Sequence, residues 1–387
     1  MLQTDIRYTK LRWLLTVLGL LLYFVDIWTD VGLSLKYLLD EQYICSALTF
    51  SFVLFGLLVT QIFSHAWYED DIKDAVVNPR GEAAVWGISS RRLMVIHVCG
   101  VGIFTRYYHL LKNSFGVVWI SNDSLDKAER REVHYRLFCH ATDLSMLKLF
   151  EAFLESAPQL LLQIYIIQDH GEASLVQYFS MIFSFFNISW ALVDYRRCLR
   201  RSLPHIQEMP SGLPTAIYLL YKLCTIGSHI LSYSLLLVLN PYCVIALVAF
   251  LWLLGTLWSH VLGTHFCTTR RHEIVYRIVV GFILTNTFFN VKGKDTKRDM
   301  AVYYIVYSFI NMTSPLLLGF LKPEVQKEMF FLVISGFIIG GTVLGMVFLL
   351  SYYGYMHPRE KKREADEVDG IGNNIVKTSR MSKFLQP

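Results

Sequence analysis

The chain has 387 residues, of which 54% are hydrophobic and 17% charged, and its formal net charge is +5. So much apolar surface excludes an ordinary soluble domain and indicates a protein that crosses a membrane several times. The basic residues gather at the ends of apolar segments, where they orient a membrane protein, so the positive charge does not support nucleic-acid binding. The seven cysteines are scattered through apolar segments and odd in number, which indicates packing residues and no disulfide framework.

Apolar windows of about 20 residues, the length that crosses a bilayer, predict the membrane spans in chain order. The first window is too long for a cleaved signal, so we expect it to remain as the first span. The eight windows are 13–37, 43–66, 143–168, 173–195, 213–239, 242–264, 300–321 and 328–354. The predicted fold class is therefore an all-α polytopic membrane protein with eight transmembrane helices.

Two further apolar stretches, 93–120 and 274–290, differ because basic residues flank both of their ends. The first is also interrupted by Arg106, His109 and Lys112, and the second is short. Since positive residues stay on the cytoplasmic side, neither stretch should cross the membrane. We expect both to be partially inserted re-entrant segments whose backbone is covered by protein. This topology places both termini in the cytosol.

The order of these segments repeats along the chain: two spans, a re-entrant segment and two spans, and then the same again. It predicts an N-terminal membrane repeat at 1–201, a linker at 202–212, a C-terminal membrane repeat at 213–356 and a cytosolic tail at 357–387. Both halves begin and end inside, so they would be parallel pseudo-repeats related by an axis along the membrane normal.

Ionisable side chains fall within the predicted spans. Asp26 and Asp30 share one face of the first helix because they are four residues apart. The third span carries a polar stripe at intervals of three and four residues, ending at Gln159, and Pro158 is expected to kink this helix. An ionised group at mid-bilayer costs about 2.5–3.5 kcal/mol on insertion scales. The predicted polar seam consists of Asp26, Asp30, Lys148, Glu151, Glu155, Asp194 and Arg196.

Two interpretations of this seam stay open. In the first, Lys148 and Arg196 neutralise the acids in a static network that holds the helices together. In the second, the seam is also a path for a substrate. The second half offers Lys222, His229, His260 and Asn311 in comparable positions, and His229 is interpreted as a hydrogen-bonded packing residue.

Three stretches carry a resemblance to a known family: "DLSMLKLFEAFLESAPQLLLQ" (143–163), "ISWALVDYRRCLR" (188–200) and "YRIVVGFILTNTFFNVKGKDTK" (276–297). They resemble the XK-related family, over nearly the whole chain, and the third points to one particular member. The resemblance implies eight spans with two partially inserted segments. It also implies, for several members, phospholipid scrambling that moves phosphatidylserine to the outer leaflet of the plasma membrane in apoptotic cells after caspase cleavage of the cytosolic tail. Other members lack that switch.

The tail contains the sequence that such a switch requires. Asp366, Glu367, Val368 and Asp369 spell DEVD and precede the small Gly370, a pattern that executioner caspases of the caspase-3 type prefer. A basic pocket in the protease would bind the Asp369 carboxylate, and the polar surroundings are typical of an accessible chain. The alternative is an ordinary solvated acidic cluster.

Cleavage after Asp369 would release the segment from Gly370 to Pro387. We expect its apolar residues to dock on the cytosolic ends of the helices and to hold an inactive state until proteolysis removes them. These predicted autoinhibitory contacts are Ile375, Val376, Met381, Phe384 and Leu385.

The function that the resemblance implies, and with which the polar seam and the tail sequence agree, is energy-independent, non-selective movement of phosphatidylserine, phosphatidylethanolamine and phosphatidylcholine across the bilayer. No enzyme chemistry, cofactor or metal is expected, because the sequence lacks GxxxxGK[ST], HExxH, GxSxG and CxxC, and the cysteines at 99 and 267 have no supporting ligands. One alternative is a secondary transporter or channel for small cationic solutes, and another is a scaffold or receptor subunit. A single-span partner subunit and a homodimer stay open as assemblies.

Small residues recur in the last predicted span, at Gly336, Gly340, Gly341 and Gly345. Such small-xxx-small positions permit the close approach of a second helix. The pattern favours packing within the chain over dimerisation.

Overall fold

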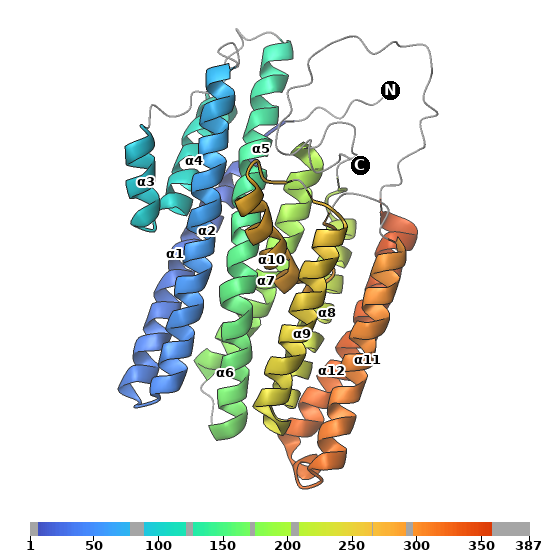
Figure 1. The fold of residues 1–387 in the computed structure, drawn as a ribbon. Coiled ribbons are helices and arrows are strands. Elements are labelled where there is room, and N and C mark those ends of the chain that lie inside the picture. The colour runs from blue at the N-terminus through green and yellow to red at the C-terminus, as the bar shows by residue number, and fades with distance from the viewer. Residues whose placement is uncertain are drawn as a thin grey trace. The chain divides into compact units, whose positions relative to one another are not determined.

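The computed structural model describes residues 7–77, 89–120, 127–170, 175–202, 209–264, 266–291 and 297–357. Over these ranges every regular element is helical and no strand forms (Figure 1). The chain divides into two compact units, Met1–Gln163 and Ile164–Pro387. The predicted repeats, 1–201 and 213–356, rest on topology and stay a prediction.

The described residues of the first unit form five helices, a π-helical turn and the start of a further helix. They are α1 (Lys10–Leu39), α2 (Tyr43–Val77), α3 (Ser90–Val98), α4 (Gly102–Trp119), α5 (Lys127–Glu151), η1 (Ala152–Ser156) and α6 (Ala157–His170). Hydroxyl caps begin two of the helices: the Thr9 side chain accepts from the Arg12 N–H, and the Ser89 side chain accepts from the Arg92 N–H. These caps satisfy N–H groups that have no partner within the helix.

The predicted re-entrant stretch 93–120 forms a helical hairpin. α3 and α4 are joined by a turn in which Gly100 has a φ of +75°, a conformation that favours glycine. α3 has nine residues and is therefore only about 14 Å long at 1.5 Å per residue, too short to cross a bilayer alone. A hairpin of this kind fits partial insertion, and its depth in the membrane stays a prediction.

The helix that carries the polar stripe is irregular where the stripe ends. η1 lies between α5 and α6, directly before Pro158, the second residue of α6. Proline has no N–H to donate to the carbonyl four residues earlier, and its ring clashes with that carbonyl, so it disturbs the regular α-helix at this point. A single π turn accommodates the break, and such turns are common at functional sites. The structure thus has a π turn that contains Glu155 just before Pro158, and the kink expected at Pro158 stays a prediction.

The second unit is organised around one long helix, α8 (Leu213–Leu239), which contacts all five of the other long helices of this unit. These are α7 (Leu175–Ser202), α9 (Pro241–Val261), α10 (Arg270–Asn286), α11 (Lys297–Leu321) and α12 (Met329–Ser351). Two short turns complete it, η2 (Val325–Lys327) and η3 (Tyr352–Met356). α9 and α10 lie side by side (Figure 1).

Small residues let α12 approach α8, as predicted. A Cβ added at Gly345 would come within 2.7 Å of Thr225 Cγ2, and one at Gly341 within 3.3 Å of Ser228 Cβ. Gly336 and Gly340 have no such neighbour within 4 Å. Packing within the chain is therefore confirmed for two of the four glycines.

Six of the described helices are long and apolar enough to cross a membrane: Lys10–Leu39, Tyr43–Ile72, Leu213–Leu239, Pro241–Val261, Lys297–Leu321 and Met329–Met356. This confirms a multi-pass, all-helical membrane protein. The windows 143–168 and 173–195 lie in α5 to α6 and in α7, which do not meet the same criteria. The third span in particular is divided by η1 and carries Lys148, Glu151 and Glu155. The total of eight spans with two re-entrant segments stays a prediction.

Candidate functional site: ionisable side chains among apolar helices

Five of the seven predicted seam residues come together in the first unit. Asp30 of α1 is 8% exposed, and its Oδ1 accepts a hydrogen bond of 2.8 Å from Gln159 Nε2 of α6. The polar face of α1 and the polar stripe of α5 to α6 therefore face each other, as the spacing predicted. We call Asp26, Asp30, Lys148, Glu151, Glu155 and Gln159 the acidic cluster.

Lys148 supplies the positive charge of the acidic cluster. Its Nζ lies 2.8 Å from Glu151 Oε1, one helical turn further along α5, and 4.7 Å from the centre of the Tyr23 ring. The Asp26 carboxyl also interacts electrostatically with Lys148. One ammonium group thus serves four carboxyl groups, and the cluster keeps an acidic surplus.

Glu155 occupies a space that a glycine of α2 provides. A Cβ added at Gly56 would lie 2.7 Å from Glu155 Oε2 and 2.9 Å from Glu155 Cβ. Only a residue without a side chain allows this approach. Glu155 is 3% exposed and interacts with Asp30 and Glu151. The π turn and Gly56 together place a carboxyl group between α2 and α1.

Two oxygens of the acidic cluster accept no hydrogen bond from any described residue. They are Glu151 Oε2 and Gln159 Oε1, both buried. A buried polar atom without a partner costs free energy, about 1–3 kcal/mol when a partner has been removed. The hydrogen-bonding capacity of the cluster is therefore not filled by the protein around it.

The other two seam residues lie in the second unit, on α7. Asp194 is near Cys198, whose Sγ is 4.0 Å from both carboxyl oxygens. Arg196 donates from Nη1 to Tyr218 Oη at 3.1 Å and to Tyr353 Oη at 2.8 Å. Because these residues belong to the other unit, one continuous seam of seven residues stays a prediction.

Aromatic rings surround Arg196. Its guanidinium carbon lies 4.7 Å from the centre of the Tyr218 ring, 5.5 Å from that of Tyr353 and 5.7 Å from that of Tyr352. Cation–π contacts stabilise a charge in this way without an acid. The sequence interpretation that Arg196 neutralises acids did not anticipate these tyrosines, although "SYYGY" (351–355) was a visible signal.

Lys222 and His229 of α8 are held by hydroxyl and carbonyl groups. Lys222 Nζ donates to Thr287 Oγ1 at 2.9 Å and to Phe288 O at 3.0 Å. The His229 ring lies 2.8 Å from Asn311 Oδ1 through Nδ1 and 3.1 Å from Thr285 O through Nε2. The interpretation of His229 as a hydrogen-bonded packing residue is therefore confirmed.

A buried ion pair in the first unit was missed by the sequence reasoning. Arg106 of α4 is 5% exposed, and its Nη1 lies 3.6 Å from Asp143 Oδ2 of α5. Arg106 also donates from Nε and Nη2 to the Oγ and carbonyl oxygen of Ser64, both at 2.9 Å. The Ser64 Oγ in turn lies 2.9 Å from His97 Nε2. Arg106 in an apolar stretch was noted, but nothing in the sequence indicated its partner.

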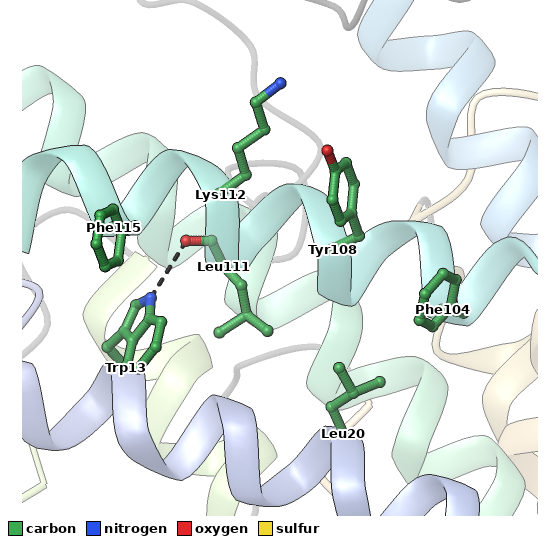
Figure 2. A pocket seen from close by; sticks show the side chains of 7 residues that line it. All are labelled: Trp13, Leu20, Phe104, Tyr108, Leu111, Lys112 and Phe115. Carbon is green, nitrogen blue, oxygen red and sulfur yellow. Dashed lines mark hydrogen bonds between the residues drawn. The ribbon is translucent and has the colours of Figure 1, made fainter.

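An open apolar hollow of about 310 Å³ lies between α1 and α4 (Figure 2). Leu20 and Phe104 lie at one end, and Trp13 and Phe115 at the other, where Trp13 Nε1 donates to Leu111 O at 3.2 Å. The Lys112 side chain extends away from the hollow. Its lining offers contact area for hydrocarbon and no polar chemistry.

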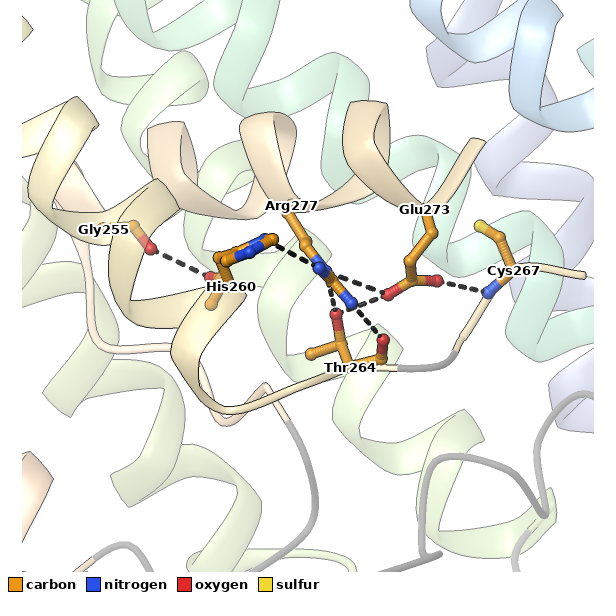
Figure 3. A network of polar contacts seen from close by, with 7 residues as sticks. Gly255, His260, Thr264, Cys267, Glu273 and Arg277 are labelled. Carbon is orange, nitrogen blue, oxygen red and sulfur yellow. Dashed lines mark hydrogen bonds and ion pairs between the residues drawn. The ribbon is translucent and has the colours of Figure 1, made fainter. Parts of the chain in front are cut away.

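The corner between α9 and α10 is fixed by a polar network (Figure 3). Arg277 donates from Nε to Thr264 Oγ1 at 2.9 Å, from Nη2 to Thr264 O at 2.6 Å and from Nη1 to His260 Nδ1 at 2.8 Å. Glu273 accepts from the Cys267 N–H at 2.7 Å and from the Thr264 hydroxyl. His260 and Cys267 thus take part in a structural contact.

The predicted cleavage site and the predicted tail contacts lie outside the described residues. The last described element is η3, and the described chain ends at His357. The positions 366–370 and 375–385 stay predictions from sequence.

Comparison with known proteins identifies the family. The family described as XK-related protein matches residues 14–358. The chain is 50% identical over 380 residues to XK-related protein 9 of Tetraodon nigroviridis, which covers 98% of this chain and 99% of the relative. It is 30% identical to XK-related protein 8 of Pan troglodytes, over 96% of this chain and 92% of the relative. These matches confirm the resemblance seen in the motifs, and the chain belongs to the XK-related family.

Proposed function

We propose that the chain is a phospholipid scramblase that is activated when a caspase cleaves its tail after Asp369. It moves phosphatidylserine, phosphatidylethanolamine and phosphatidylcholine down their transbilayer gradients, without covalent chemistry and without a cofactor. It acts at the plasma membrane of apoptotic cells, with both termini in the cytosol.

The acidic cluster carries this proposal. A purely static network would be expected to satisfy its own buried polar atoms, yet Glu151 Oε2 and Gln159 Oε1 accept no hydrogen bond from the described protein. These oxygens have the chemistry to accept hydrogen bonds from water or from the amino group of phosphatidylserine and phosphatidylethanolamine. Four carboxyl groups beside one ammonium group favour such a donor.

The mechanism requires only that the barrier for a headgroup falls. Each 1.4 kcal/mol removed from it speeds exchange about tenfold. Polar side chains on α1 and α5 let a headgroup exchange its hydration for protein contacts and water, while the acyl tails stay in lipid. Because the lipid moves down its gradient, no energy source is needed.

The tail supplies the switch in this proposal. The apolar residues between Ile375 and Leu385 dock on the cytosolic ends of the helices, and cleavage removes them irreversibly. The last described element before the tail, η3, is attached to α7 through the hydrogen bond between Tyr353 and Arg196. The tail therefore follows directly in the chain after an element that is hydrogen-bonded to α7, so cleavage of the tail can affect the helices of the second unit.

A liposome experiment tests the proposal. Full-length protein is reconstituted with a fluorescent phospholipid in both leaflets, and dithionite is added from outside before and after treatment with caspase-3. Quenching beyond the outer half of the signal, only after cleavage, supports scrambling. Asp369→Ala should remain uncleaved and silent, whereas the control Glu364→Gln, which changes an acid outside the DEVD sequence, should be cleaved and active. Cleaved protein that leaves the inner half protected would contradict the proposal.

The excess of carboxyl groups in the acidic cluster favours a second candidate function. Four carboxyl groups around one lysine also suit a small cationic solute. Flux of such a solute through liposomes whose lipid leaflets do not mix would favour a transporter or channel. If neither lipid exchange nor solute flux is observed, the result would favour a scaffold.

A further inference from the structure

A second cluster of ionisable side chains lies in the first unit, apart from the acidic cluster. Asp71 of α2 and His140 and Asp143 of α5 each direct one nitrogen or oxygen atom toward the others, and these atoms all lie within 4.8 Å of one another. We propose that this trio binds a divalent transition-metal ion, with Zn²⁺ as the best match.

The helices position the three side chains. His140 and Asp143 are three residues apart and so lie on the same face of α5. α2 packs against α5 and brings Asp71, close to the end of its apolar segment at Ile72, to that face. Asp143 is 3% exposed and forms the floor, while Asp71 and His140 are partly exposed. An ion can therefore enter from the side of Asp71 and His140.

The kind of donor atoms selects the metal. One imidazole nitrogen and two carboxylate oxygens form a mixed set that suits Zn²⁺, whereas Ca²⁺ and Mg²⁺ prefer oxygen ligands alone. Zinc binds these ligands at about 2.0–2.2 Å in a tetrahedral arrangement, and a water molecule can complete three protein ligands. Atoms separated by up to 4.8 Å reach this geometry with small side-chain movements.

The local charge permits a cation. Arg106 contributes one positive charge, with its Nη1 3.6 Å from Asp143 Oδ2, but its shorter hydrogen bonds of 2.9 Å go to Ser64. Counted by themselves, two carboxylates, one guanidinium group and a neutral imidazole have a net charge of −1, and a divalent ion would change it to +1. Arg106 thus fixes one oxygen of Asp143 without cancelling the charge of the trio.

The consequence of binding is a link between α2 and α5. The same two helices, with η1, form the contact between Gly56 and Glu155 in the acidic cluster. A metal ion at the trio would hold α2 against α5 and would stabilise that contact. The binding itself does not depend on the proposed lipid transport.

Zinc titration of the full-length protein tests the site. Protein in detergent micelles is freed of metal with a chelator, which is then removed, and Zn²⁺ binding is followed by calorimetry. We expect one Zn²⁺ site, whose affinity Asp71→Asn and His140→Ala each lower at least tenfold. Losing a residue that only supports a metal ligand already lowers affinity about 10–100-fold, and losing a ligand should not cost less. Zn²⁺ should also raise the thermal midpoint of the wild type, because it binds the folded state, and should raise it less in both variants.

Matched controls separate this site from other histidines and acids. Asp70→Asn changes the neighbouring acid of α2, and His272→Ala removes a histidine of α10, and both should bind Zn²⁺ as the wild type does. Asp143 is left unchanged because its loss would also deprive Arg106 of its ion pair. If Asp71→Asn, which preserves shape, or a folded His140→Ala binds Zn²⁺ with unchanged affinity, the site is refuted. Wild-type protein that binds Zn²⁺ no more tightly than a protein carrying both Asp71→Asn and His140→Ala refutes it equally.

Discussion

The two units stabilise buried charged side chains among apolar helices in different ways. In the acidic cluster of the first unit, four acids surround one cation: Lys148 Nζ lies 2.8 Å from Glu151, while Asp30 accepts a hydrogen bond from Gln159. In the second unit, the cations Arg196 and Lys222 are held by tyrosine hydroxyls and rings, a threonine hydroxyl and a carbonyl oxygen. The first arrangement depends on opposite charge, and the second depends on neutral dipoles and aromatic faces.

This difference indicates where exchange with lipid or water is expected. Arg196 is held by the hydroxyls of Tyr218 and Tyr353 and by three tyrosine rings, without an acid. One hydroxyl of this group, Tyr352 Oη, is buried and makes no hydrogen bond to the described residues. The acidic cluster keeps an excess of acceptors, with Glu151 Oε2 and Gln159 Oε1 unfilled by described residues. If the chain transports lipid as proposed, the first unit is therefore the better candidate for that role, and the cations of the second unit are better explained as structural.

The largest expected effect comes from removing the cation of the acidic cluster. Lys148→Met should lower the free energy of unfolding by about 3 kcal/mol or more, because breaking a buried ion pair leaves an uncompensated charge. The measurement is denaturation in mixed micelles, followed by tryptophan fluorescence. Lys148→Arg, which keeps the charge, is the control and should lose less. Equal stability of Lys148→Met and wild type would show that the acids do not depend on Lys148.

The next effect concerns the space for Glu155. Gly56→Ala places a Cβ 2.7 Å from Glu155 Oε2, so Glu155 must move, and overpacking of this kind typically costs about 1–3 kcal/mol. After caspase cleavage, the displaced carboxyl should also slow lipid exchange in liposomes. Gly32→Ala on α1 is the control, because an added Cβ there would meet no described atom outside its own stretch of helix within 4 Å; it should lower neither property. A Gly56→Ala protein with normal stability and exchange would mean that the position of Glu155 is unimportant.

Sequence periodicity predicted much of the acidic cluster. Helix geometry placed Asp26 and Asp30 on one face and Lys148 and Glu151 on another, and the cost of isolated charges in lipid favoured a meeting of the two faces. Their meeting is observed through Asp30 and Gln159. The apolar windows predicted the helices in the same way, within a few residues at most ends.

Contacts that depend on tertiary packing could not be predicted. Arg106 and Asp143 are 37 positions apart and belong to no periodic pattern, so their pairing follows from how α4 packs on α5. The place of Gly56 beneath Glu155 depends on the π turn, which changes the helical phase after Glu151. The partners of Arg196 likewise come from α8 and η3, far along the chain.

A smaller effect is expected at the tyrosines of the second unit. Arg196→Lys keeps the charge but loses the planar group that donates to Tyr218 and Tyr353 together. The loss of one hydrogen bond from a charged donor lowers the free energy of unfolding by about 1.5–3 kcal/mol at most. The loss should be smaller here, because the lysine ammonium group can still donate to one of the two tyrosines. Thermal midpoints of Arg196→Lys and Tyr353→Phe should fall by similar amounts. A much larger fall for Arg196→Lys would indicate an acidic partner in addition to the tyrosines.

The smallest effect is expected at Lys222, and it makes the comparison of the units most direct. Lys222→Met removes two hydrogen bonds, to Thr287 and to the carbonyl oxygen of Phe288, but it also relieves the cost of burying an ammonium group, which is several kcal/mol. Because no carboxylate contributes to the electrostatic surroundings of Lys222 among the described residues, no opposite charge is left behind. We expect a net change within about 1 kcal/mol, given that these two contributions oppose each other. The same substitution at Lys148 should lower the free energy of unfolding several times more. Both variants can be measured in one denaturation series. Equal losses at the two lysines would show that the acidic cluster does not depend on its counter-charge more than the surroundings of Lys222 do.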